Sequence, residues 1–139
     1  MQKSLVKLEV DQVDKVWDAC VPILEKAIAY SEGYYDIDDL YQMVKNGHQD
    51  LWVMFDDQIT LVGTTRIVHY PNKSVLEIPF LATKDKGGLG DARSMLSQVE
   101  DWAKEQGVEA TVFFARIGWK KIFPEFKLKH TLMMKDYEV

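Results

Sequence analysis

The spacing of apolar and polar residues divides the chain into strands and helices. From Ser4 to Val10 apolar and polar residues alternate, which is typical of a half-buried strand. Two amphipathic helices are expected next. The first begins after Asp11, which is expected to cap it, and the second runs from Asp36 to a stop at Asn46-Gly47. Pro22 lies inside the first helical pattern and predicts a kink or a split there.

Three strands joined by short turns are expected in the middle of the chain. They cover residues 51–55, 59–70 and 75–82, and the short turns favour an antiparallel meander. Gly63, inside the second of these strands, indicates a bulge or a close backbone approach. Pro79 has no backbone donor, so pairing of the third strand is expected to break near it and leave backbone groups for a ligand.

A second group of elements completes the predicted fold. An amphipathic helix from Leu89 to Gly107 is followed by a strand over 109–116, a short helix over 118–123 and a last strand over 127–137. A helix separates the strands 75–82 and 109–116, so these two are expected to be parallel. The order β-α-α-β-β-β-α-β-α-β in a single domain, residues 1–139, indicates an α+β (mixed α/β) fold with a central mixed sheet.

Composition limits the classes of function. The chain has 139 residues, of which 47% are hydrophobic, and a net charge of −5, which suits one domain with its own core and argues against a nucleic-acid partner. Cys20 is the only cysteine and lies on an apolar helical stripe, so it is expected in the core of a protein from a reducing compartment. We expect no signal peptide, no membrane span and no metal site, and a cytoplasmic localisation.

Charge is spread unevenly along the chain. Residues 1–62 contain five Lys, no Arg and twelve acidic residues. Residues 116–135 contain six basic residues and one acidic residue, Glu125. Two interpretations stay open: a solvated basic face, or attraction for an anionic cofactor at the C-terminal side.

A glycine-rich turn, Thr83 to Gly90, joins the strand over 75–82 to the following helix. Such a junction can bind an anion, because the N–H groups of the first helical turn are unpaired and the helix dipole favours negative charge there. Gly88 and Gly90 lack side chains, so a phosphate could approach the backbone. The alternative is that these glycines only shape the turn.

The order of elements and this turn resemble the GNAT superfamily of acyl-CoA N-acyltransferases. The family signature, Arg/Gln-x-x-Gly-x-Gly/Ala, is similar to Asp85-Lys86-Gly87-Gly88-Leu89-Gly90: both glycines match, and Asp85 replaces the usual Arg or Gln. The run Ala115-Arg116-Ile117-Gly118-Trp119 resembles a Gly-Arg-x-Gly-Trp run in members encoded by tailed phages.

The resemblance implies acetyl-CoA as cosubstrate and an amine-bearing small molecule or protein as acceptor, and it allows a homodimer. The cofactor contacts that it implies come from the end of the strand, the loop and the stretch after the fifth strand: Phe80, Leu81, Lys86, Gly87, Gly88, Leu89, Gly90 and Arg116. Tyr34 and Tyr35, between the first two helices, are acceptor-site candidates by the same resemblance; the alternative is that they cover the core.

Glu77 is the candidate catalytic residue. A carboxylate in an apolar strand must face water, a partner or a cleft, because burying it without compensation is expensive. Alternation predicts the faces of this strand: Glu77 with Pro79 and Leu81, opposite Leu76, Ile78 and Phe80. In the GNAT pattern a Glu here takes a proton from the acceptor amine, and His69 and Tyr70 could assist. The alternative is a surface carboxylate, exposed or ion-paired.

One expected residue is absent from the sequence. Many GNAT enzymes place a Tyr in the short helix after the fifth strand, where it protonates the leaving thiolate, but residues 118–126 contain none. Phe123 and Phe126 have the ring without the hydroxyl. Slow N-acetyl transfer is the expected function. The alternatives are a weak or inactive GNAT-fold binding or structural protein, such as a phage accessory protein, and an inhibitor or modifier of a host protein.

Overall fold

A mixed five-stranded sheet forms the centre of the protein. The computed structural model describes residues 3–31, 33–85, 88–113, 119–129 and 132–137. The sheet has the order β1-β2-β3-β4-β5, in which β4 and β5 are parallel and the other neighbours antiparallel. Its strands are β1 (Ser4–Lys7), β2 (Asp50–Phe55), β3 (Ile59–His69), β4 (Ser74–Thr83) and β5 (Ala110–Phe113). The predicted α+β fold class, with its meander and one parallel crossover, is confirmed.

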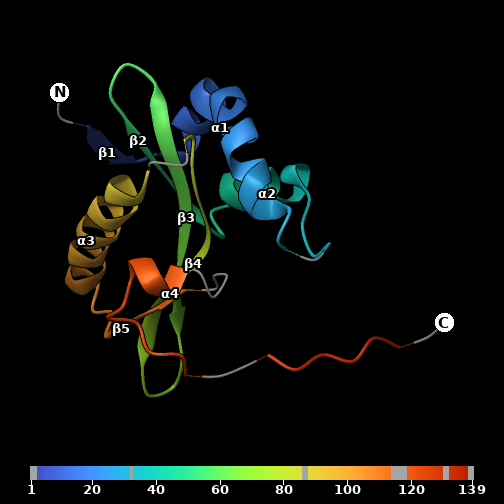
Figure 1. Cartoon of the computed structure of the whole chain (residues 1–139), viewed down its shortest axis with the longest axis vertical. Coiled ribbons are helices and arrows are strands. Elements are labelled where there is room, and N and C mark those ends of the chain that lie inside the picture. Colours follow the sequence, from blue (N-terminus) through green and yellow to red (C-terminus); the bar gives the residue numbers. More distant parts are fainter. Residues whose placement is uncertain (1–2, 32, 86–87, 114–118, 130–131, 138–139) are drawn as a thin grey trace.

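Helices cover both faces of the sheet (Figure 1). On one face lie α1 (Val13–Ile28), which a short 3-10 helix η1 (Val10–Gln12) precedes, and α2 (Ile37–Lys45). On the other face lie α3 (Leu89–Glu105) and the short α4 (Trp119–Ile122). We call these the α1/α2 face and the α3 face.

The helix ends follow local capping chemistry. Glu9 and Gln12 form a reciprocal capping box at η1, so the prediction that Asp11 caps the first helix is wrong. The second helix starts next to Asp36 as predicted, and Asp36 caps α2, accepting a hydrogen bond from the backbone N–H of Asp39 at 2.8 Å. Pro22 does not split α1, which continues through it because its buried stripe packs on the sheet.

The α3 face buries a mainly aliphatic and aromatic cluster. Its buried members are Trp52, Met54, Leu61, Leu76, Ile78, Leu81, Ala92, Met95, Leu96, Val99, Ala103 and Phe123. A Cβ at Gly63 would lie 2.8 Å from Cε of Met95 on α3, so the glycine leaves room for the end of this side chain. The close approach expected at Gly63 is thus made by a side chain. Gly107, with a φ of +82°, follows the end of α3 as predicted.

The α1/α2 face buries a second cluster. Its buried apolar members are Val13, Cys20, Ile23, Leu24, Leu40, Val44, Leu51, Val53, Val62, Phe80 and Ala82. Cys20 lies in this core as expected, and burial raises the pKa of its thiol to about 12. The thiol is therefore protonated and shielded at neutral pH.

A bulge in β4 decides which side chains reach each face. Thr64 pairs with Phe80 and Arg66 with Glu77, so β4 has one more residue than β3 over this stretch. The irregularity expected at Pro79 is thus present, but pairing with β3 resumes and continues up to Thr83, so the predicted break just before the glycine loop is wrong. Leu81 joins the α3 face with Leu76 and Ile78, whereas Phe80 faces α1 and α2. The prediction that Leu81 shares the face of Glu77, and Phe80 the opposite one, is therefore wrong.

The C-terminal segment differs from the prediction. Residues 127–129 and 132–137 contain no strand, although their alternation predicted one. Residues 132–137 lie apart from the sheet in Figure 1, and Leu132 and Met133 are highly exposed. Alternation describes a segment able to pair, and pairing further requires a neighbouring strand. Across the described ranges, none of the helices has the length and apolar character to cross a membrane.

Candidate functional site

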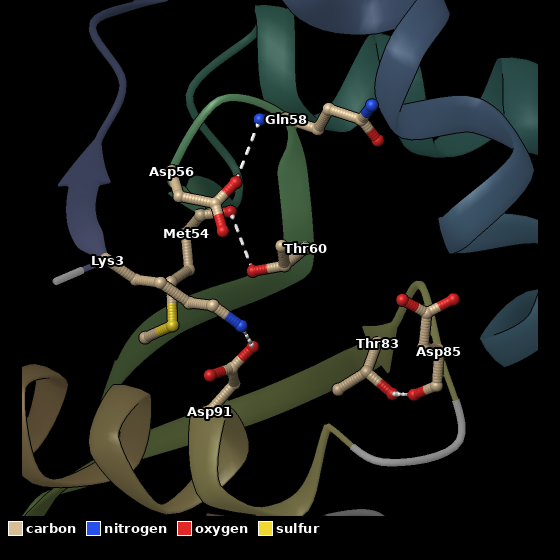
Figure 2. Close-up of polar contacts among 8 residues, drawn as sticks. All are labelled: Lys3, Met54, Asp56, Gln58, Thr60, Thr83, Asp85 and Asp91. Carbon is tan, nitrogen blue, oxygen red and sulfur yellow. Dashed lines mark hydrogen bonds and ion pairs between the residues drawn. The ribbon is translucent and has the colours of Figure 1, made fainter. Parts of the chain in front are cut away.

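The loop between β4 and α3 is held by bonds to one carbonyl group. The hydroxyl of Thr83 donates to the carbonyl oxygen of Asp85 at 2.8 Å, and the N–H of Gly88 donates to the same oxygen at 3.1 Å (Figure 2 shows the first bond). A Cβ on Gly88 would lie 2.5 Å from the Cβ of Thr83. Gly88 is therefore required by the packing of the loop itself.

The first turn of α3 is open at its second glycine. Gly88 is the N-cap of α3, and a Cβ built on Gly90 would meet no atom within 4 Å. Leu89, beside it, is 47% exposed. The backbone of this turn can accordingly be reached from solvent, as binding of a phosphate would require. Lys86 and Gly87, two of the predicted contacts, lie outside the described residues.

Hydrogen bonds from two lysine ammonium groups connect the loop to α1 and to the β2–β3 turn. The ammonium of Lys26 on α1 donates to the carbonyl oxygen of Lys84 at 2.7 Å and reaches that of Thr83 at 3.4 Å. The ammonium of Lys84 donates to the side-chain oxygen of Gln58 in the β2–β3 turn. Within the described residues neither cation forms an ion pair with a carboxylate, so both leave positive charge near the loop.

Three carboxylates lie in or near this loop: Asp85 in the loop itself, and Asp91 and Asp56 close to Lys3 (Figure 2). Lys3 forms an ion pair of 2.7 Å with Asp91, in the first turn of α3, and this hydrogen bond is the main cause that raises the pKa of Lys3. A backbone hydrogen bond from Gln58 is the main cause that lowers the pKa of Asp56. Asp85, in place of the signature Arg or Gln, adds a negative charge to the loop itself.

The described part of the parallel ladder between β4 and β5 reaches the β4 bulge. The described ladder extends from Val75 and Ala110 to Ile78 and Phe113. Pro79 itself has no partner in β3, and the residues of β4 from Phe80 onward pair with β3 only, within the described part of the chain. Two predicted cofactor contacts, Phe80 and Leu81, follow this point and are buried on opposite faces. Residues 114–118, and with them Arg116, lie outside the described residues.

Glu77 is buried and ion-paired. Its side chain is 7% exposed and accepts a hydrogen bond of 2.5 Å from Nε of Arg66 on β3. Both side chains face α1 and α2, because Leu76 and Ile78 on either side of Glu77 face α3. The alternative interpretation of Glu77 was a surface carboxylate, either exposed or ion-paired. The structure confirms the ion pair, but the side chain is buried and not exposed. Periodicity did not identify Arg66, although it is the only Lys or Arg in β3.

Two buried polar atoms without a hydrogen-bond partner in the described structure lie on the same face. One is Oγ1 of Thr64, two residues before Arg66, and the other is Oε1 of Gln49, just before β2. The amide nitrogen of Gln49 contacts Sδ of Met43 on α2 at 3.7 Å, which places this side chain under α2. Near them the ring of Tyr35 meets Phe80 edge-on at 5.5 Å. The loop between α1 and α2 thus reaches the β4 bulge, whereas Tyr34 is 62% exposed.

Other candidate residues lie elsewhere. His69 pairs with Ser74 at the far end of the hairpin and by alternation faces α3, so it does not join Glu77; Tyr70 is 54% exposed just beyond it. Phe123 is 1% exposed and packs on the α3 face, where Trp119 stacks on it at 5.8 Å. In the described ranges, no group of three or more His, Cys, Asp or Glu side chains could hold a metal ion.

Comparison with solved structures identifies the fold. The structure is similar to a predicted acetyltransferase with acetyl-CoA from Clostridium acetobutylicum (TM-score 0.67, 14% identity, covering 99% of this chain and 96% of that one). It is also similar to glucosamine-6-phosphate N-acetyltransferase from Arabidopsis thaliana (TM-score 0.67, 14% identity, 99% and 100% covered).

A GNAT family acetyltransferase from Staphylococcus aureus matches as well, with a TM-score of 0.69, 12% identity and 99% and 100% of the two chains covered. No protein-family model matches the sequence, and no curated protein is similar to it in sequence. The chain therefore has the fold of the GNAT acetyltransferases, established by structure alone.

Proposed function

We propose that the protein is an acyl-CoA-dependent N-acetyltransferase that uses acetyl-CoA. The similarity of fold over nearly the whole chain supports the class, and the open turn at Gly90 is the observation that supports cofactor binding. When bound, acetyl-CoA supplies an activated acetyl thioester. The neighbours named for glucosamine 6-phosphate and for aminoglycosides support an amine as acceptor, on a small molecule or a protein. A homodimer, a cytoplasmic localisation and relation to phage-encoded members stay predictions.

Residues of the loop would bind the cofactor, and residues of the sheet would position the acceptor. Backbone N–H groups of Leu89 and Gly90 would bind phosphate, with Lys26 adding positive charge nearby. Phe80, Leu81, Lys86, Gly87 and Arg116 stay predicted contacts. Catalysis would be mainly positioning of the acceptor amine against the thioester.

Glu77 is proposed as the general base that accepts a proton from the acceptor amine, directly or through one water. Its ion pair with Arg66 fixes the carboxylate in one place, as a positioned base requires. Phe123 has no hydroxyl group and is buried on the α3 face, so it cannot protonate the departing thiolate. Another donor, such as solvent, would supply this proton.

Cofactor binding is tested by calorimetry with CoA on three proteins. The wild type is expected to bind, and Gly90→Glu is expected to abolish binding, because its carboxylate would occupy the open side of the turn. Gly90→Ala is the matched control: a methyl group meets no atom, so the fold and most of the affinity should be kept. Wild-type protein without CoA binding at millimolar ligand would refute the proposal.

Turnover is tested separately with Glu77→Gln. If Glu77 is the base, the amide should lower kcat by about 10²–10⁴ with little change in CoA affinity. Release of free thiol in the presence of an amine panel measures it. A binding or structural protein is the second candidate, which Asp85 in the signature position and the absence of a Tyr in residues 118–126 favour. Tight CoA binding without thiol release above hydrolysis would select that candidate.

A further inference from the structure

The guanidinium of Arg66 is only partly used by its ion pair. An arginine has five N–H donors in a rigid fork, and the bond to Glu77 uses only Nε. Its side chain is 37% exposed, whereas that of Glu77 is 7% exposed. Among the described residues the two terminal nitrogens have no further partner. The two terminal nitrogens of Arg66 are therefore available to a ligand on the exposed side of the pair, next to the buried carboxylate of Glu77.

Two buried side chains near this pair also have a polar atom without a hydrogen-bond partner in the described structure. Thr64 is fully buried on the same face, two residues along β3, and its hydroxyl has no partner in the described structure. Gln49 is 2% exposed, and the register that pairs Asp50 with Thr65 brings it beside Arg66. Buried polar atoms without partners are rare in native proteins and call for a ligand, water or function. Among the described residues, they lie beside the ion pair that joins β3 to β4 on this face.

The charge of the pair restricts the ligand that can approach it. Arg66 and Glu77 together are neutral. A ligand with only positive charges would place like charge against the exposed guanidinium, which is unfavourable. A ligand with an amine and an acidic group can put the amine toward Glu77 and the acid on the free fork of Arg66. Carboxylate and phosphate both accept two parallel hydrogen bonds from an arginine fork.

We propose that Arg66 is the acceptor-specificity residue of this protein, and that it binds the carboxylate or phosphate of an acceptor whose amine lies at Glu77. The inference rests on the proposed function, because it takes Glu77 to mark the acceptor side of the site. The acceptor class is an amine that carries its own acidic group. Simple polyamines, which lack that group, are disfavoured.

The test uses acceptors that differ only in the acidic group. L-lysine and cadaverine differ by one carboxylate, and phosphoethanolamine and ethanolamine differ by one phosphate. Binding to the CoA-saturated wild type is followed by NMR, including the Nε–H signal of Arg66, and turnover by thiol release. In at least one pair the acid-bearing member should bind and react at least about tenfold better, because a site built for a polar group rejects the analogue that lacks it. The pair that responds separates carboxylate from phosphate.

Variants separate recognition from structure. Arg66→Gln should erase the preference by raising KM for the acid-bearing acceptor, with little change for the truncated one. Arg66→Lys keeps the charge without the fork and should retain part of the preference. Arg93→Gln is the matched control, since Arg93 lies on α3 and pairs with Glu125 at 3.6 Å. Circular dichroism reports folding, and the wild-type comparison decides the question even if Arg66→Gln does not fold.

The outcomes distinguish this inference from the proposed function. Equal binding and equal rates for both members of each pair overturn the role of Arg66 while acetyl transfer stands. Acid-selective acceptor binding without thiol release supports Arg66 and overturns catalysis. Failure of the wild type to bind CoA or any acceptor overturns both.

Discussion

The two faces of the sheet differ in how completely their polar groups are satisfied. On the α3 face, Nε1 of Trp52 donates to the hydroxyl of the buried Thr65 at 2.9 Å, and the surrounding cluster is apolar. On the α1/α2 face, the neighbouring Thr64 is equally buried and its hydroxyl has no partner in the described structure. The buried carboxylate of Glu77 lies on this second face.

This contrast separates a stabilising face from a functional one. An unsatisfied buried polar group costs about 1–3 kcal/mol, so a fold keeps such groups mainly where they serve another purpose. The α3 face contains no comparable group among the described residues. Substitutions in the cluster of the α3 face should therefore change stability without changing binding, whereas those of Arg66 and Glu77 on the α1/α2 face should change binding as well.

The largest effect is expected at Phe123, in the centre of the α3 face. Phe123→Ala removes a ring that packs on Phe113, Trp119 and Phe126, and should lower the free energy of unfolding by about 3–5 kcal/mol. Urea unfolding measures the loss. The folded fraction should still bind CoA, and a loss below about 1 kcal/mol would contradict the assignment of this ring to the core.

Breaking the charged pair is the next test. Arg66→Gln leaves Glu77 buried without its cation and should cost about 2–4 kcal/mol, below the value for a fully buried pair because Arg66 is 37% exposed. The double variant Arg66→Met, Glu77→Met should recover most of this loss, since it buries no charge, yet it should bind no acceptor. Thermal unfolding of the three proteins gives the comparison. A double variant less stable than Arg66→Gln would show that the pair contributes net stability.

The adjacent threonines compare the faces directly. Thr65→Val breaks the bond from Trp52 and should cost about 1–2 kcal/mol, whereas Thr64→Val removes a buried hydroxyl without a partner and should raise the free energy of unfolding by about 1–3 kcal/mol. Both substitutions keep the side-chain shape. Equal losses in urea unfolding would mean that the hydroxyl of Thr64 is satisfied, for example by water.

The smallest effect is expected at the exposed edge of the α1/α2 face. Hydrogen bonds from Lys45 and then Tyr41 hold the pKa of Asp14 below its usual range. A lowered pKa contributes stability that is present above the unfolded value of about 3.9 and is lost as the pH falls through the folded value. Asp14→Asn should therefore flatten the decline of stability below about pH 4. Unfolding between about pH 5 and 2 tests this. The effect should shrink at high salt because Asp14 is 57% exposed.

Local patterns determined much of this protein. Alternation and helical spacing predicted all five strands of the sheet and the three long helices, because these patterns depend only on residues a few positions apart. The cap at Asp36, the helix end at Gly107 and the buried thiol of Cys20 follow from the same short-range chemistry. The glycines of the loop were evident too, although the reason that Gly88 is needed, its contact with Thr83, was not.

Only the tertiary structure decided which side chains meet. The β4 bulge shifted Phe80 and Leu81 to opposite faces, because one extra residue inverts every side chain beyond it. The ion pair between Arg66 and Glu77 depends on the register between β3 and β4, and the sequence of neither strand alone determines that register. Residues 127–129 and 132–137 alternate as a strand does, yet they form none. Alternation shows only that a segment can pair, and the whole fold decides whether a neighbouring strand is present.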